Sequence, residues 1–150
     1  MNTESHNDPS ARQRWMSVLA KADPARLAAL MPDLPTLEPL RPPEVGAVMV
    51  RGRVGATGAP FNLGEMTVTR CSVRLADGTV GHGYVQGRDK THALRAAAVD
   101  ALMQTDQAAQ LRVAVLDHLT AEADARWALR AAKAAATKVD FFTMVRGEDA

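Results

Sequence analysis

The first apolar pattern of the chain is helical. Trp15, Val18 and Leu19 recur at a spacing that places them on one side of a helix. Asp23 has a side chain that can cap a helix, and Pro24 suits the first helical position, so a second short helix is expected there. Together these patterns predict an N-terminal helical arm.

Proline interrupts the helical pattern next. Five of the eight prolines fall between residues 32 and 43. Because proline fixes φ and lacks a backbone donor, this segment can be neither a helix nor a central strand, and we expect an extended connector. After it the pattern becomes the alternation of a β-sheet, with valines on one face and Arg51 and Arg53 on the other. The predicted strands cover residues 45–54, 65–76 and 79–86.

The pair Asp77-Gly78 is typical of a two-residue hairpin turn. Such a turn pairs Val73 with His82 and Cys71 with Tyr84 on a mostly apolar face, which we expect to lie on the core. His82 is then interpreted as a hydrogen-bonded core residue. Tyr84 is interpreted as a core residue whose hydroxyl group reaches an edge.

Four arginines are expected on the opposite, outer face of the sheet, if the first strand joins the other two. This arginine face consists of Arg51, Arg53, Arg70 and Arg74. Guanidinium groups so arranged repel one another unless anions or carboxylates face them. The face is therefore either an ordinary solvated surface or a contact for an acidic partner or a phosphorylated ligand. Gly81 and Gly83 would leave this face shallow enough for another backbone or a ligand to come close. Nucleic acid is disfavoured because stacking aromatic residues are missing.

Helical spacing returns in the last third of the chain. Leu94, Ala98 and Leu102 mark a buried stripe, and two further helices are predicted over 107–119 and 121–138. The fold class is therefore α+β: a small antiparallel sheet of three or more strands, packed against helices. We expect a flexible N-terminus (1–10) and one domain (11–150), divided into the helical arm (11–31), the connector (32–43), the sheet (44–87), the helices (88–138) and a C-terminal docking tail (139–150).

The docking tail is predicted from its unusual apolar residues. Phe141, Phe142 and Met144 lie close to the terminus, followed by Arg146. Because termini usually fray and are polar, these residues are expected to dock into the fold or into another subunit.

Composition adds the broad class. The net charge of +1 gives no strong field for nucleic acid or membrane, and aromatics make up only 4% of residues. Cys71 is the single cysteine, which fits a reducing cytoplasm. No apolar run approaches the roughly 18 residues of a membrane helix, and the N-terminus lacks an apolar signal core. We expect a soluble cytoplasmic protein without nucleic-acid or membrane partners.

No local pattern indicates catalysis or metal binding. The four histidines are scattered, and Cys71 has no nearby partner that could share a metal. The glycine-rich loop over 52–64 lacks the Gly-Lys-Ser/Thr and the helix of a Walker-type phosphate site. We therefore predict no catalytic residue, no metal and no cofactor bound by this chain.

The corner Arg88-Asp89-Lys90 stands where the last strand leads into a helix. The free N–H groups of a helix N-terminus favour negative charge. Asp89 could cap this helix or pair with Arg88. The corner is thus a capped turn, an anion site or a protein–protein contact.

Four stretches resemble one known family. They are RQRWMSVLAKA (12–22), VTRCSVRLADGT (68–79), YVQGRDKTHA (84–93) and VDFFTMVRGE (139–148). In this order they closely resemble the G subunit of the bacterial carbon–phosphorus lyase system. The resemblance extends from about Arg12 to Glu148. It is loose in the proline-rich connector and between Thr105 and Ala136.

The resemblance implies a subunit of the core complex that also contains the H, I and J subunits, with the L subunit as a functional partner. This complex supports displacement of adenine from ATP by methylphosphonate, which gives alpha-D-ribose 1-methylphosphonate 5-triphosphate. The chemistry is assigned to the I subunit, so this chain is expected to bind closest to I. ATP is then a substrate of the complex, and the chain alone is expected to be inactive.

Two functions from different classes are weighed. The first is a non-catalytic subunit of this transferase in phosphonate catabolism, and the second is a free-standing anion-binding or regulatory module that uses the basic sheet face. The residues expected at subunit interfaces are Trp15, Met16, Arg51, Arg53, Arg88, Asp89, Lys90, Phe141, Phe142, Met144 and Arg146. The apolar residues of this set either anchor a partner or complete the chain's own core. The residues expected to approach substrate or other anions are Arg88, Lys90, Arg70 and Arg74.

Overall fold

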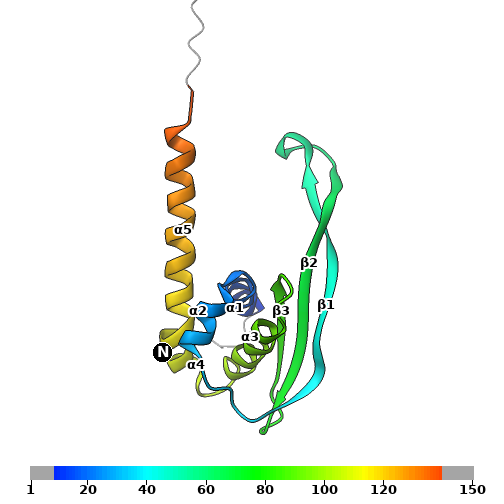
Figure 1. Cartoon of the computed structure of the whole chain (residues 1–150), viewed down its shortest axis with the longest axis vertical. Coiled ribbons are helices and arrows are strands. Elements are labelled where there is room, and N and C mark those ends of the chain that lie inside the picture. The colour runs from blue at the N-terminus through cyan, green and yellow to red at the C-terminus, as the bar shows by residue number, and fades with distance from the viewer. Residues whose placement is uncertain (1–8, 140–150) are drawn as a thin grey trace, which may run out of the picture.

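The computed structural model describes residues 9–139 and confirms the α+β class. Three antiparallel strands form one sheet in the order β1-β2-β3, so β1 is an edge strand. Helices α1, α2 and α3 lie on one face of this sheet, and α5 stands on the far side of them (Figure 1). The elements are α1 (Pro9–Lys21), α2 (Pro24–Leu30), β1 (Leu37–Arg53), a 3-10 turn η1 (Val54–Ala56), β2 (Pro60–Leu75), β3 (Val80–Gln86), α3 (Lys90–Leu102), α4 (Ala108–Leu111), a π-helical turn η2 (Arg112–Leu116) and α5 (Asp117–Ala136).

The start of α2 confirms the capping predicted for it. The Asp23 carboxylate accepts hydrogen bonds from the backbone N–H groups of Ala25 and Arg26, at 2.8 and 3.1 Å. Pro24 occupies the first turn, where its missing N–H group costs nothing. The helix is held in place by Leu27, which is fully buried in the core.

Strand β1 is longer than predicted, so the expected connector is wrong from Leu37 onward. Three prolines of that segment, Pro39, Pro42 and Pro43, lie within β1. They are tolerated because β1 is an edge strand, where a missing N–H donor need not break a ladder on both sides. The pairing with β2 nevertheless shifts register on both sides of Arg41, so the prolines leave irregularities in the strand.

The turn between β2 and β3 is one residue longer than predicted. Leu75 pairs with Thr79, its N–H group donating to the Thr79 carbonyl at 2.9 Å, so three residues form the loop. Gly78 takes a φ of 91°, a left-handed conformation that glycine adopts without strain. The Asp77 carboxylate accepts a hydrogen bond from the Thr79 N–H group at 2.8 Å. This three-residue loop with a left-handed glycine is another common hairpin connection.

The longer turn shifts the register of β3 by one residue, which moves each of its side chains to the other face. His82 is therefore paired with Ser72 and Tyr84 with Arg70. Both predictions of a core position are wrong: His82 is exposed, and 44% of Tyr84 is exposed. Gly83 turns inward instead, with Gly81 and Val85.

The inward-facing glycines let α3 pack directly on β3. A Cβ atom added to Gly81 would lie 2.1 Å from the Ala97 carbonyl oxygen, and one added to Gly83 would lie 2.2 Å from the Ala93 carbonyl oxygen. The close approach of another backbone was predicted for these glycines, but on the outer face. The core around α3 is built mainly from small residues, including Cys71, Val73, Val85, Ala93, Ala96, Ala97, Ala98, Val99 and Ala101.

The last helices form one continuous helical segment. Two separate helices with a break near Thr120 were predicted, but α4, η2 and α5 follow one another without an interruption from Ala108 to Ala136. No glycine or proline lies in this stretch, so nothing in it ends a helix. Among the described helices, none combines the length and apolar character that crossing a membrane would require.

Candidate functional site

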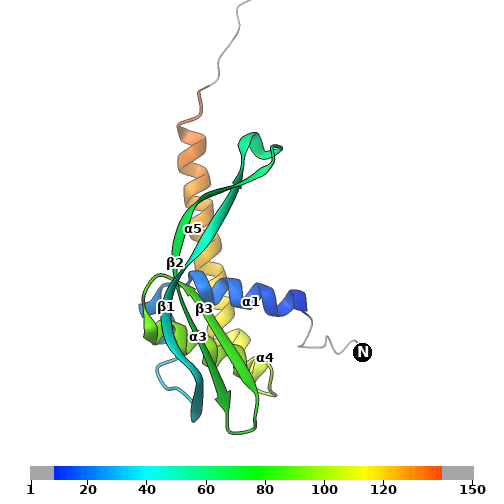
Figure 2. The same ribbon diagram turned by 90° about the vertical axis from the view of Figure 1, so that its right-hand side faces the viewer.

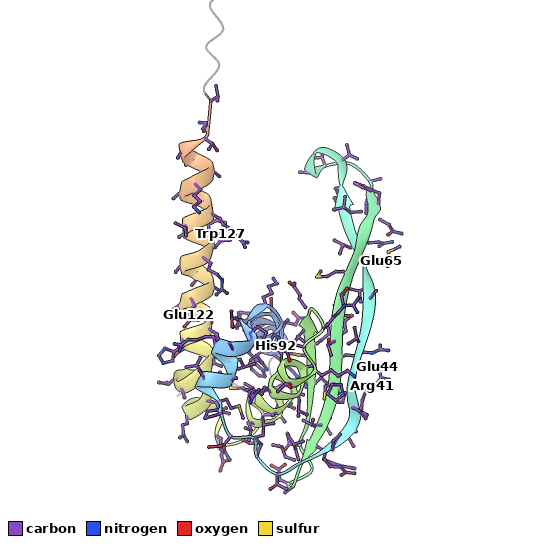
Figure 3. The ribbon with its side chains drawn as sticks, viewed as in Figure 1. Arg41, Glu44, Glu65, His92, Glu122 and Trp127 are labelled. Carbon is purple, nitrogen blue, oxygen red and sulfur yellow. The ribbon has the colours of Figure 1, made fainter. Side chains whose placement is uncertain are left out.

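The arginine face is smaller than predicted and is largely neutralised by carboxylates. Arg74 pairs with Glu38 at 3.1 Å, and Arg70 with Glu44 at 3.5 Å, each across the β1–β2 ladder. Arg41 lies 4.0 Å from the same Glu44, and Figure 3 labels both on the outer side of β1. Exposed pairs of this kind stabilise a protein by about 0–1 kcal/mol. They do, however, supply the facing negative charge that the arginines require.

Arg51 and Arg53 do not join this face, which corrects the prediction of one four-arginine surface. Both residues lie at the C-terminal end of β1, opposite Asn62 and Pro60 of β2. The Arg53 guanidinium donates to the Gly58 carbonyl at 3.2 Å, within the hairpin tip. The charge of these two side chains therefore lies at the tip of the hairpin.

The corner at residues 87–90 is a capped strand-to-helix turn. Asp89 is the N-cap of α3, and its carboxylate accepts from the His92 N–H group at 2.9 Å. Gly87 makes the turn with a φ of 94°, and its carbonyl accepts from the Thr69 hydroxyl at 2.7 Å. A carboxylate of the chain thus already holds the helix N-terminus. Arg88 and Lys90 are exposed, and in residues 9–139 neither takes part in a salt bridge.

The roles in this corner can be separated by mutation. Asp89→Ala is expected to lower the free energy of unfolding by about 1 kcal/mol, because a helix loses its N-cap. Arg88→Ala combined with Lys90→Ala is expected to change it by less than about 0.5 kcal/mol, since both side chains are exposed. Urea denaturation followed by circular dichroism measures both values. A double variant as unstable as Asp89→Ala would show that the two cations support the fold.

A buried carboxylate that the sequence analysis did not single out joins α1, α3 and β3. Asp100 of α3 is fully buried, and its carboxylate accepts hydrogen bonds from Nε and Nη2 of Arg12, at 3.1 and 2.7 Å. It also accepts from the Trp15 indole N–H group at 2.9 Å and from the backbone N–H group of His82 at 2.8 Å. The available signal was an acidic residue within an apolar helix, in the stretch AAAVDAL. With all four donors on the chain itself, Asp100 acts in the architecture of the fold.

The two histidines near the sheet have structural contacts. His92 is buried beside α1, and its Nε2 lies 2.8 Å from the Leu19 carbonyl oxygen (Figure 3). Its Nδ1 makes no hydrogen bond with any described residue. Because a carbonyl oxygen can only accept, Nε2 donates this hydrogen bond. His82 is exposed on the outer face, with Nδ1 2.8 Å from the Ser72 hydroxyl.

The other reactive side chains are also accounted for by local structure. Burial raises the pKa of the Cys71 thiol, so at neutral pH this side chain is an unreactive thiol in the core. Hydrogen bonding from Thr79 lowers the pKa of the exposed Asp77 in the hairpin turn. Within the described part of the chain, no three His, Cys, Asp or Glu side chains are grouped in a way that could hold a metal ion.

Comparison with known proteins decides the family. The family model for the phosphonate metabolism protein PhnG matches residues 10–147, nearly the whole chain. The chain belongs to the PhnG family. A PhnG relative from Rhizobium meliloti (strain 1021), alpha-D-ribose 1-methylphosphonate 5-triphosphate synthase subunit PhnG, is 47% identical over 141 residues. These residues cover 92% of this chain and 90% of the relative. The predicted resemblance is confirmed.

In this PhnG chain the predicted interface residues fall into different environments. Trp15 is only 4% exposed and bonded to Asp100, so it completes the chain's own core. Met16 is half-buried against that core. The cationic candidates Arg51, Arg53, Arg88 and Lys90 are exposed, as is Asp89. Phe141, Phe142, Met144 and Arg146 lie outside the described residues.

Proposed function

We propose that this PhnG-family chain is a non-catalytic subunit of a complex that makes alpha-D-ribose 1-methylphosphonate 5-triphosphate. The complex would take ATP and methylphosphonate as substrates and release adenine. The observation that supports this function is the 47% identity, over nearly the full length, to a protein named as a subunit of that synthase. The described residues agree with a supporting role, because Asp100 and His92 are engaged in packing α1 and α3.

We further propose cytoplasmic H, I and J subunits as partners, with the I subunit closest and the L subunit acting with them. The chain would bind no cofactor of its own, and ATP would be handled by the complex. Large apolar side chains stay exposed on this chain, among them Trp127 at 73% and Leu63 at 66%. Such residues are what a partner subunit covers in a stable assembly.

Arg88 and Lys90 remain the candidates for contact with substrate by this chain. Arg70 and Arg74 already face Glu44 and Glu38, which weakens the case for an anion on the sheet. The same pairs remove the observation that motivated a free-standing anion-binding module. Arg88→Ala with Lys90→Ala, assayed in the assembled synthase, would raise the KM for ATP or methylphosphonate if these side chains touch substrate.

Omitting the chain tests the proposed function. The synthase subunits are co-purified with and without it, and release of adenine from ATP is measured in the presence of methylphosphonate. We expect the rate to fall roughly tenfold or more without the chain, equivalent to about 1.4 kcal/mol in the barrier. The chain by itself should release no adenine. An unchanged rate without the chain, or turnover by the isolated chain, would contradict the proposal.

A further inference from the structure

Two segments extend from the packed body in the same direction (Figures 1 and 2). The hairpin arm, residues 47–67, is the part of the β1–β2 ribbon that continues beyond β3, which pairs with β2 only from Val68. The helix arm, residues 125–139, is the C-terminal part of α5 with residues 137–139, and is distinct from the N-terminal helical arm (11–31). No residue of either arm is buried.

Neither arm has a core of its own. A two-stranded ribbon is marginally stable in water, and an isolated helix of roughly 12–15 residues is marginal even when rich in alanine. Both arms nevertheless carry large apolar side chains, of which Trp127 is labelled partway along α5 in Figure 3. The exposed apolar residues of the arms are Met49, Val54, Phe61, Leu63, Trp127, Leu129 and Val139. A surface that buried these apolar side chains would therefore stabilise the arms.

Both arms carry a net positive charge. Residues 47–67 and 125–139 contain one acidic residue, Glu65, and six basic residues: Arg51, Arg53, Arg126, Arg130, Lys133 and Lys138. Arg126 and Arg130 are separated by four positions on α5, where like charges repel. In the part of the chain that the structure describes, neither makes a salt bridge. An acidic surface would relieve this repulsion.

We propose that the hairpin arm and the helix arm bind one and the same partner subunit, through a surface that is apolar and bears carboxylates. The inference rests on the proposed function, since it assigns the partner to the synthase. A symmetric contact between the arms of two copies does not fit, because cationic arms would meet cationic arms. A polyanion such as nucleic acid would leave Val54, Leu63 and Leu129 uncovered, whereas a protein surface covers apolar and charged groups together.

Site-specific cross-linking tests whether the arms share one partner. The photoreactive residue p-benzoylphenylalanine replaces Leu63 in one variant and Trp127 in another, within the co-purified synthase. We expect both to cross-link to the same partner chain, in peptides with net negative charge. A third variant carries the residue at Gln110, an exposed position of α4 on the body, and should not give those products. Cross-links to two different chains, to a second copy of this chain, or to none would overturn the proposal.

Affinity measurements test the chemistry of the contact. Two variants are compared: Trp127→Ala, and the double variant Arg126→Ala with Arg130→Ala. Each is expected to raise the Kd with which this chain binds the complex of the remaining subunits roughly tenfold or more. The arginine variant should also lose part of the salt dependence of binding. Lys21→Ala removes an exposed cation from the body and should leave the Kd unchanged. Circular dichroism checks that each variant is folded, because a misfolded variant would bind weakly whatever the role of the replaced side chain.

These outcomes are separable from failure of the proposed function. If omission of the chain leaves adenine release unchanged, the proposed function fails whatever the cross-links show. If omission abolishes adenine release while the arm variants bind as tightly as the original chain, only the arm proposal fails. Tight binding of a fluorescent oligonucleotide, lost in the Arg126→Ala and Arg130→Ala variant, would overturn the protein-partner proposal in favour of a polyanion.

Discussion

Replacing Gly81 with alanine is expected to lower the free energy of unfolding by about 3 kcal/mol, near the upper end of the cost of overpacking a core. The added Cβ atom would lie 2.1 Å from the Ala97 carbonyl oxygen and 2.5 Å from the Ala101 backbone nitrogen. Both are backbone atoms of α3, so only a shift of the helix away from β3 relieves the clash. Urea denaturation followed by circular dichroism measures the loss.

Gly46→Ala is the matched control for this variant. Gly46 also lies in a strand, but a Cβ atom there would have no neighbour within 4 Å. The free energy of unfolding should change by less than about 0.5 kcal/mol, as for other exposed positions. If both substitutions cost the same, the loss would come from the glycine backbone itself, and the tight packing of β3 on α3 would not be its cause.

Replacing Asp100 with alanine is expected to cost about 3–5 kcal/mol, the usual result of removing one partner from a buried ion pair. The change leaves the Arg12 guanidinium without its carboxylate, at a position where its side chain is only 31% exposed. It also leaves the Trp15 indole N–H and the His82 backbone N–H without acceptors. The same denaturation experiment measures the effect, which should appear as a lower midpoint.

The exposed ion pair between Arg26 and Glu122 is the control. At 2.6 Å it is as short as the buried contact, but its side chains are 42% and 34% exposed. Glu122→Ala should therefore cost less than about 1 kcal/mol. Comparable losses for Asp100→Ala and Glu122→Ala would mean that burial does not distinguish the two contacts.

Local chemistry predicted several elements of the fold correctly. The side-chain cap of Asp23 and the position of Pro24 at the start of α2 follow from rules that act within one turn of helix. The outward position of Arg70 and Arg74 and the inward position of Cys71 and Val73 follow from the period of β2 itself. These features depend on a few neighbouring residues, which the sequence contains directly.

The failures arose where two local solutions differ little in energy. Asp77-Gly78 suits a two-residue turn and also a three-residue loop, and only the longer loop lets Gly81 and Gly83 face α3. The packing of α3 therefore settles the register. Likewise, the prolines within β1 exclude a central strand but permit an edge strand, and tertiary pairing with β2 decided between strand and connector.

The candidate interface could be predicted only in part. The exposed cations of the hairpin were identified from alternation, but their separation from Arg70 and Arg74 depends on the length of β1. The exposure of Trp127 was not predicted, because an alanine-rich helix is equally compatible with burial. The hairpin arm and the helix arm point in the same direction because of how the body packs, and no short stretch of sequence encodes that arrangement.

The outer edge of β1 has uneven protection against self-association. Its first half contains Pro39, Pro42, Pro43 and charged residues, which discourage another strand from adding to the sheet. The segment VGAVMV, residues 45–50, has neither proline nor charge, and its outward backbone groups face no other strand of the sheet. While this edge is uncovered, it is therefore a β-prone template for aggregation. If the partner subunit proposed for the hairpin arm also covers this edge, synthesis of this chain in step with that partner would limit aggregation.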